Sequence, residues 1–251
     1  MIRSIKIPML RAYSSYIIKE MQLQKICDDY DELIMELLQT PSVYARENAL
    51  KAIYSFGDPK LVRDAFVQLS ARKIVHNEKL LLDGLLSFTG DVRQLAAQLM
   101  DSYDALLECY RNSLINFLGQ KRIDTYDERL MCMTNLPVDT LCSIVRKLER
   151  NPSNRNLMFL EKTIDEYRNT DNWEPVAIAV KGLGVYPGIE KVRGILLEML
   201  VSRNWYIRKN AACALVAGGL TKEELEQVHA KHDRFAEDAL QYEMARRQVY
   251  V

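Results

Sequence analysis

The sequence lacks an excess of charge of either sign. It contains 34 Lys and Arg residues against 34 Asp and Glu residues, and residues 1–125 alone carry 16 basic and 16 acidic side chains. Neither half therefore has a field that would attract nucleic acid or an anionic membrane. The longest hydrophobic run has only seven residues, Ala211–Ala217. A membrane-spanning helix needs about 20, so we expect no transmembrane segment.

The first residues, MIRSIKIPMLR, also lack the continuous apolar segment and the small-residue cleavage site of a signal peptide. We therefore expect a cytoplasmic protein. The basic residues Arg3, Lys6 and Arg11 leave a second interpretation open. In that interpretation the chain is the soluble part of a membrane-associated assembly whose anchor lies upstream.

Cysteine is scarce, irregularly spaced and never arranged as CxxC. This pattern favours small core residues in a reducing compartment over disulfides or metal ligands. The five positions are Cys27, Cys109, Cys132, Cys142 and Cys213.

Residues that could carry chemistry are few. Glu226, His229 and His232 lie close together on one expected helix, at a spacing that metal sites in helical bundles use. A charged, solvated face near the end of the chain explains them equally simply, and we predict no metal site. His76 precedes an expected helix, where it suits a capping or loop role. Nucleophile-elbow, phosphate-loop and dinucleotide motifs are absent, so we predict no catalytic residue, no cofactor and no enzyme.

One local pattern occurs twice. Residues 43–53 read VYARENALKAI and residues 205–215 read WYIRKNAACAL, with Tyr, Arg, Asn and two Ala at equal places. The starts lie 162 residues apart, which is about five steps of 32. A Gly-Asp turn also recurs, with Gly57 and Gly90 separated by 33 residues. Repetition at this period indicates stacked helical hairpins.

We therefore expect an all-α protein: a right-handed α-α superhelix, or solenoid, of about six to seven stacked hairpins forming a single domain over 1–251. Residues 1–42 would form an N-terminal helical pair, 43–232 the repeats, and 233–251 a C-terminal capping helix. Both terminal helices should have polar outer faces. The expected hairpins lie at 8–39, 43–73, 76–102, 104–135, 137–170, 173–203 and 205–232, with loop signals at 119–127 and at 151–156 (NPSNRN).

The helix starts VYAREN and WYIRKN, the Ala-rich helix interiors, the Gly-Asp turn and the Val-Arg pairs opening second helices resemble the short-repeat form of the HEAT family. The resemblance covers 43–102 and 173–220 well and the middle poorly. It implies a structural ladder between repeats, made by turn aspartates and second-helix arginines. The matching positions are Asp58, Asp91, Arg63, Arg93 and Arg193.

This architecture favours a non-enzymatic protein–protein interaction scaffold whose second helices line a concave surface. The polar residues of those helices are mixed in sign, which suits a protein partner better than a phosphate backbone. Its candidate interaction residues are Lys60, Arg63, Arg93, Lys191 and Arg193.

Two alternatives come from the same resemblance. Some HEAT-like proteins act as alkylation-repair DNA glycosylases, but a neutral chain makes nucleic acid an unlikely partner. Others resemble phycobilin lyases or chaperone-like helpers, for which the sequence offers no nucleophile or cofactor motif.

Aromatic and arginine residues recur at equal places in the repeats. Trp173 and Trp205 each open an expected helix, and we favour packing against the preceding hairpin over exposed anchors in a binding groove. Tyr44 and Tyr206 recur in the same way and suit a surface somewhat better. For the paired Arg46 and Arg208 we expect ion pairs with neighbouring acids.

Overall fold

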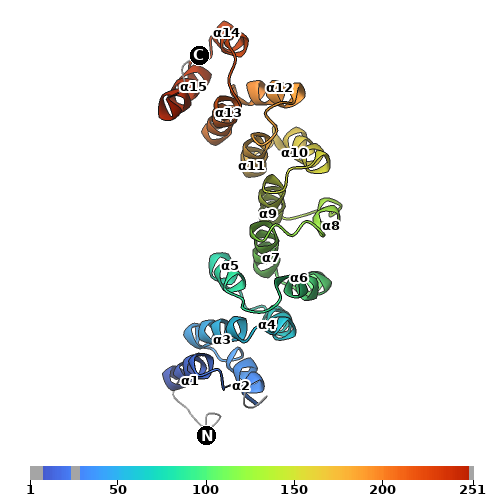
Figure 1. Cartoon of the computed structure of the whole chain (residues 1–251), viewed down its shortest axis with the longest axis vertical. Helices are drawn as coiled ribbons and strands as arrows, with labels where there is room; N and C mark the ends of the chain where they lie inside the picture. The colour runs from blue at the N-terminus through green and yellow to red at the C-terminus, as the bar shows by residue number, and fades with distance from the viewer. Residues whose placement is uncertain (1–7, 24–28, 249–251) are drawn as a thin grey trace. The chain divides into compact units, whose positions relative to one another are not determined.

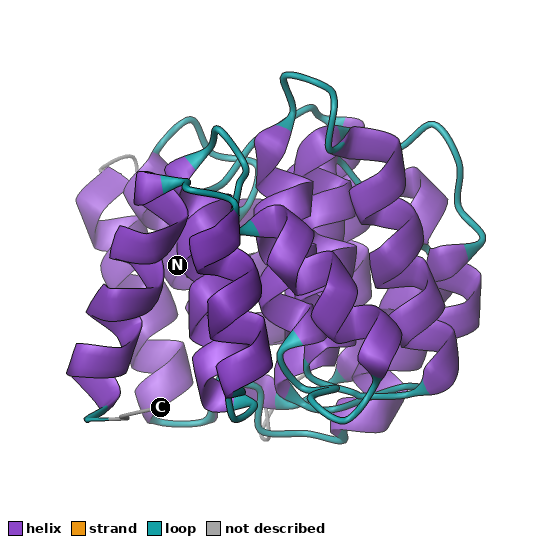
Figure 2. Cartoon of the chain, turned by 90° about the horizontal axis from the view of Figure 1, so that it is seen from above, coloured by secondary structure: helices purple, strands orange, loops and turns teal. Residues whose placement is uncertain are grey.

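The computed structural model describes residues 8–23 and 29–248 of the chain. These residues form fifteen α-helices joined by loops, turns and short 3-10 segments, and no strand occurs among them (Figures 1 and 2). The expected all-α class is confirmed. No helix in this part of the chain is long and apolar enough to cross a membrane. Arg3, Lys6 and Cys27 lie outside the described residues.

The chain divides into two compact units, residues 1–118 and 119–251, and α7 crosses the boundary. In the first unit α1, α3 and α5 lie on one side and α2, α4 and α6 on the other (Figure 1). The helices of this unit are α1 (Pro8–Glu20), α2 (Asp29–Leu37), α3 (Val43–Phe56), α4 (Pro59–Ala71), α5 (Glu78–Leu86), α6 (Val92–Asp101), the 3-10 helix η3 (Tyr103–Ala105) and α7 (Glu108–Gln120).

The second unit repeats this two-sided arrangement, with odd-numbered helices on one side and even-numbered helices on the other (Figure 1). Its helices are α8 (Asp127–Met131), α9 (Val138–Glu149), α10 (Asn154–Tyr167), α11 (Trp173–Leu183), α12 (Glu190–Met199), α13 (Trp205–Ala217), α14 (Lys222–Ala230) and α15 (Arg234–Arg247). Whether the two units together form the single domain expected from the sequence stays a prediction.

Helices pack mainly on the next helix but one. In the first unit α3 packs along α1, and α6 packs along α4. In the second unit α9, α11, α13 and α15 form a continuous row. Because short loops join consecutive helices into hairpins, this order of packing is consistent with hairpins stacked on one another.

Bonds between neighbouring hairpins recur at the spacing of the sequence repeat. Arg72 donates to the side-chain oxygen of Gln39 at 2.8 Å, 33 residues away. Asn210 donates to the carbonyl of Ala177 at 2.7 Å, again 33 residues away. Equivalent positions of successive hairpins are therefore in contact, and the repeat in the sequence follows from that contact.

The turn after α3 shows how local signals set these boundaries. Ser42 caps α3 by accepting a hydrogen bond from the amide of Ala45. The helix ends at Gly57, whose φ of 75° is the left-handed conformation that glycine adopts most readily. Asp58 then caps α4 and Pro59 occupies its first turn, as the sequence predicted.

Of the two loop predictions, one needs correction and the other is largely confirmed. Of the NPSNRN segment only residues 151–153 lie outside a helix, because Ser153 accepts a hydrogen bond from the amide of Asn156 and starts α10 at Asn154. The loop at 119–127 is largely confirmed, because α7 ends at Gln120, α8 begins at Asp127, and residues 121–126 lie outside a helix. The helix that follows this loop, α8, has only five residues.

The polar outer faces expected at the two ends of the chain are confirmed on α15 and wrong on α1. On α1, Tyr13, Tyr16 and Ile17 are exposed, and their spacing places them on one stripe of the helix. The exposed face of α15 is mainly polar, with Arg234, Asp238, Gln241 and Arg246 on it, and it also carries Phe235 and Tyr242.

Candidate interaction surface

The second unit exposes a group of aromatic side chains where its odd-numbered helices begin. Trp173 opens α11, Trp205 and Tyr206 open α13, and Phe235 is the second residue of α15. Trp205 and Tyr206 are each 53% exposed, and Phe235 is 66% exposed. We call these four residues the aromatic edge.

Ring contacts join three of these four residues, Trp173, Trp205 and Tyr206. Tyr206 stacks on Trp173 with ring centroids 4.9 Å apart and planes only 9° from parallel. Trp205 meets the edge of Tyr206 at 5.1 Å and 79°. Trp173 is half-buried against the core of the unit, and the ring on which it stacks, that of Tyr206, belongs to the following hairpin. Trp205 is instead exposed in the way that a binding anchor would be.

Two cations lie over the outer rings. The amino group of Lys209 is 5.0 Å from the centre of the Trp205 ring, and the guanidinium of Arg208 is 5.2 Å from that of Phe235. Both distances are within the range of cation–π attraction. Arg208 is fixed by hydrogen bonds to the carbonyls of the preceding loop, at 2.6 Å and 2.9 Å. The aromatic edge is therefore an ordered surface with two positive charges.

The ion pairs expected for Arg46 and Arg208 are wrong. Like Arg208, Arg46 donates to two carbonyls of the loop before its helix, those of Thr40 at 2.7 Å and Pro41 at 2.9 Å. Arg111, at the same helical position in α7, reaches farther back and donates to the carbonyls of Tyr103 and Asp104 in η3. An arginine on the fourth residue of a helix reaches back over the first turn, where unpaired carbonyls offer neutral acceptors. These arginines therefore fix loops.

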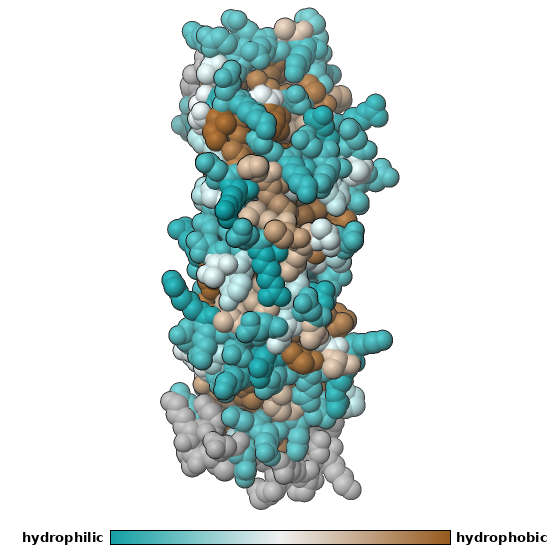
Figure 3. Space-filling view, turned by 90° about the vertical axis from the view of Figure 1, so that its right-hand side faces the viewer, coloured by the Kyte–Doolittle hydropathy of each residue, from teal (hydrophilic) through white to brown (hydrophobic). Residues whose placement is uncertain are grey.

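The cationic residues predicted on the second helices differ in their surroundings. Lys60 on α4 and Arg93 on α6 are exposed, and their side chains make no hydrogen bond or ion pair with the described residues. Arg63 on α4 pairs with Asp64 and also donates to Gln98 on α6 at 3.2 Å. This side of the molecule, seen in Figure 3, is mainly hydrophilic with scattered apolar patches.

In the second unit the corresponding residues join neighbouring hairpins. Lys191 on α12 pairs with Glu161 on α10 at 2.6 Å. Arg193 pairs with Glu224 on α14 and also donates to the carbonyls of Gly218 and Gly219. Burial alone would raise the pKa of Glu224, but its hydrogen bonds to Arg193 and Thr221 outweigh burial and lower that pKa. The guanidinium of Arg193 is therefore already engaged within the chain.

The ladder implied by the HEAT resemblance takes another form. Asp58 and Asp91 accept hydrogen bonds from backbone amides at the starts of α4 and α6. Second helices are joined instead by acids on the helices themselves, as in the pair of Arg168 with Glu198 at 3.2 Å. Cross-hairpin pairing thus occurs, with partners that the family pattern did not indicate.

The candidate metal residues do not form a cluster. Nδ1 of His229 on α14 lies 3.1 Å from Oε1 of Glu237 on α15. Glu226 also lies on α14 but does not take part in this contact, and His232 lies beyond the end of that helix. Within the described residues no group of three or more His, Cys, Asp or Glu side chains is arranged to hold a metal ion. Cys109 and Cys142 are buried as expected, while Cys213 is partly exposed and Cys132 is exposed, contrary to its expected place in the core.

Buried polar residues serve packing rather than an open site. His76 is buried, with Nδ1 2.8 Å from the hydroxyl of Tyr110, and burial lowers the pKa of its imidazole. Asn77, not His76, caps α5. Lys147 on α9 pairs with Asp127 on α8, and burial lowers the pKa of its amino group to about 8. That amino group is therefore still mainly charged at neutral pH.

Phe235 is the member of the aromatic edge that the sequence analysis missed. It stands two residues after the capping residue Asp233, as Tyr206 stands two residues after the capping residue Asn204. Matching the caps, rather than the longer repeat pattern, would have revealed it.

No protein-family model matches this chain, and no curated protein matches it. Its likeness to a known repeat family therefore rests on the residues described above.

Proposed function

We propose that the chain is a non-enzymatic protein-interaction scaffold, built like HEAT-repeat proteins as a right-handed superhelix of stacked hairpins. Packing of each helix on the next but one supports stacking, as do hydrogen bonds between residues 33 apart. Arg46 and Arg208 support it further, because they fix equivalent loops in two hairpins.

The aromatic edge is the observation that carries the proposal. Trp, Tyr and Arg dominate the residues on which protein interfaces depend most, and large exposed apolar groups are otherwise unfavourable. Stacking has already ordered Trp173 and Tyr206, so a partner would lose little side-chain entropy by contacting them. The partner surface that fits is apolar with acidic residues, because Arg208 and Lys209 flank the rings.

The second helices contribute less than the sequence suggested. Lys60, Arg63 and Arg93 remain the candidate cations on that side in the first unit. Lys191 and Arg193 hold neighbouring hairpins together, so their charges are largely matched within the chain. We assign the main contact to the aromatic edge and an auxiliary one to the three cations of the first unit.

The test is an affinity pull-down from lysate of the native organism, read by mass spectrometry. One variant carries Trp205→Ser and Phe235→Ser, and another carries Lys60→Glu and Arg93→Glu. Tyr44→Ser is the matched control, since Tyr44 is an equally exposed aromatic residue (63%) near the start of α3, outside the aromatic edge. All five side chains are exposed, so each variant should keep the helicity and thermal midpoint of the parent.

A protein that is captured by the parent and by Tyr44→Ser, and lost by the Trp205/Phe235 variant, supports the proposal. Loss only with the Lys60/Arg93 variant would move the main contact to the second helices. Capture of nucleic acid, or of a coloured tetrapyrrole, would contradict the scaffold and favour a glycosylase-like or lyase-like activity.

A further inference from the structure

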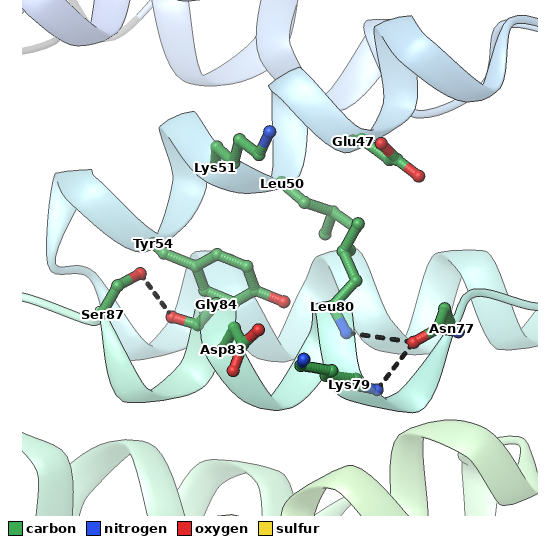
Figure 4. A pocket seen from close by; sticks show the side chains of 10 residues that line it. All are labelled: Glu47, Leu50, Lys51, Tyr54, Asn77, Lys79, Leu80, Asp83, Gly84 and Ser87. Atoms are coloured by element: carbon green, nitrogen blue, oxygen red, sulfur yellow. Dashed lines mark hydrogen bonds between the residues drawn. The ribbon is translucent and has the colours of Figure 1, made fainter.

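The first unit contains a groove between α3 and α5, with a volume of about 510 Å³ (Figure 4). One wall is a stripe of α3 from Glu47 to Tyr54, and the other is a stripe of α5 ending at its capping residue, Ser87. Both helices run in the same direction along the groove (Figure 4). Each wall uses positions three and four residues apart, which is the spacing of one helix face.

The base of the groove is apolar and closely packed. Leu50 and Tyr54 are buried, Leu80 is half-buried, and all three line the groove. The ring of Tyr54 lies against the backbone of α5 at Gly84, where a Cβ atom would be 2.1 Å from Cε2 of the ring. Glycine is unfavourable inside a helix, so its presence here serves the close approach of this ring.

The hydroxyl of Tyr54 is buried without a hydrogen-bond partner. In Figure 4 it points toward the side chains of Leu50 and Leu80. Almost all buried hydroxyl groups in proteins are hydrogen-bonded, because an unpaired one has lost water without replacement. An acceptor supplied from the groove would remove this deficit.

The rim of the groove carries four charges of alternating sign. Glu47 and Lys51 lie one turn apart on α3, and Lys79 and Asp83 lie one turn apart on α5. None of the four forms an ion pair with another described residue. Figure 4 shows Glu47 at the same end as Lys79, and Lys51 at the same end as Asp83. Each end of the groove thus offers one acid and one base.

We propose that this groove binds an amphipathic α-helix of a partner protein, with apolar residues at one face, both acidic and basic residues flanking them, and one side-chain oxygen that accepts from Tyr54. Two parallel helical walls match a third helix laid between them, as in other helix-in-groove interfaces. An anionic ligand would meet Glu47 or Asp83 at either end, whereas a helix with flanking charges of both signs satisfies the whole rim.

The site is separate from the aromatic edge. The groove lies in residues 1–118 and the aromatic edge in residues 119–251, and the two are tested with different variants. Failure of one proposal therefore leaves the other intact.

The experiment selects binders from a displayed library of helical peptides of about 18 residues, long enough to hold a helix. Leucine occupies one face of each peptide, and the flanking positions are randomised. Selection uses the full chain, with counter-selection against a variant carrying Lys51→Glu and Lys79→Glu, which makes all four rim charges negative. Lys121→Glu is the matched control, because Lys121 is equally exposed and lies outside the groove.

The expected result is enrichment of peptides that carry both acidic and basic flanks and become more helical on binding. Their affinity should fall at least about tenfold for the Lys51/Lys79 variant and remain unchanged for Lys121→Glu. For Tyr54→Phe, which keeps the ring, affinity should fall about threefold to tenfold while the fold is retained.

Enrichment of peptides that bind the Lys51/Lys79 variant as well as the parent would overturn the proposal, as would enrichment of extended, proline-rich peptides. Binding of decanoate to the parent but not to Leu80→Arg, with no peptide enriched, would also overturn it and identify a lipid-like occupant.

Discussion

Substituting alanine for two helical glycines should change stability in opposite directions. Gly84 lies within α5 and Gly194 within α12, so both side chains would be added to a helix. A Cβ atom at Gly84 would lie 2.1 Å from the ring of Tyr54, whereas a Cβ atom at Gly194 would meet nothing within 4 Å. The two substitutions are chemically identical and differ only in the space around them.

The magnitudes follow from two terms. Alanine is favoured over glycine inside a helix by about 1 kcal/mol, and this gain applies at both positions. At Gly84 an added methyl group must also displace a buried aromatic ring, and overpacking of this kind costs about 1–3 kcal/mol. Because 2.1 Å is far inside the 3.0 Å that real contacts respect, we use the upper value. Gly84→Ala should thus destabilise by about 2 kcal/mol, and Gly194→Ala should stabilise by about 0.5–1 kcal/mol.

Urea-induced unfolding, followed by far-ultraviolet circular dichroism, measures both effects. Thermal midpoints should differ from the parent by roughly 4–8 °C downward for Gly84→Ala and by a few degrees upward for Gly194→Ala. The effect of Gly84→Ala should shrink on a Tyr54→Leu background, where the ring is gone. Equal stabilisation at both glycines would refute the contact between Tyr54 and α5, and with it the described base of the groove.

Three further predictions concern polar contacts. Lys147→Met should destabilise by about 3–5 kcal/mol because it leaves the Asp127 carboxylate buried without its cation, and adding Asp127→Leu should restore most of that loss in urea unfolding. Arg193→Ala should cost about 1–3 kcal/mol at neutral pH. Because the folded pKa of Glu224 is lowered, the stability that its pair with Arg193 supplies is present above pH 4.5 and is lost as pH falls through the folded pKa, so Arg193→Ala should show a flatter acid decline in stability. The folded pKa of His76 is also lowered, so the folded chain binds fewer protons than the unfolded chain between that pKa and 6.5. Stability should therefore decrease as the pH is lowered through that window, and it should decrease less in His76→Gln. An NMR titration of the imidazole should show the lowered midpoint.

Local sequence signals were sufficient for the secondary structure and its order. The Gly57-Asp58-Pro59 turn identified one helix end and the next helix start, because glycine, a capping carboxylate and proline each favour one backbone conformation there. The NPSNRN segment misled for the same local reason. Its polar residues suit a loop, yet a serine in that segment can also cap a helix, and Ser153 does so.

Contacts between hairpins were harder to predict, because the repeat spacing shows which helices are neighbours but not which of their side chains form a pair. The spacing of about 32 residues brings α12 next to α10 and α14, yet it does not say which acid Arg193 meets. That choice depends on helix rotation and on Glu224 being drawn toward Thr221 by a capping box. The groove could not be predicted at all, since it arises from how far α3 and α5 stand apart.

The aromatic edge shows how a repeat can specify both fold and function. Residues two places after a capping side chain face solvent: Tyr44, Tyr206 and Phe235 all occupy that place and are 63%, 53% and 66% exposed. On α5 the same place holds Lys79, so Tyr44 has no aromatic counterpart on the next odd-numbered helix. On α11, α13 and α15 each helix start supplies an aromatic ring; the rings of α11 and α13 stack on one another, and the ring of Phe235 on α15 lies under the guanidinium of Arg208. Positions that the repeats share thus build the stack, and the positions where they differ decide where an interaction surface forms.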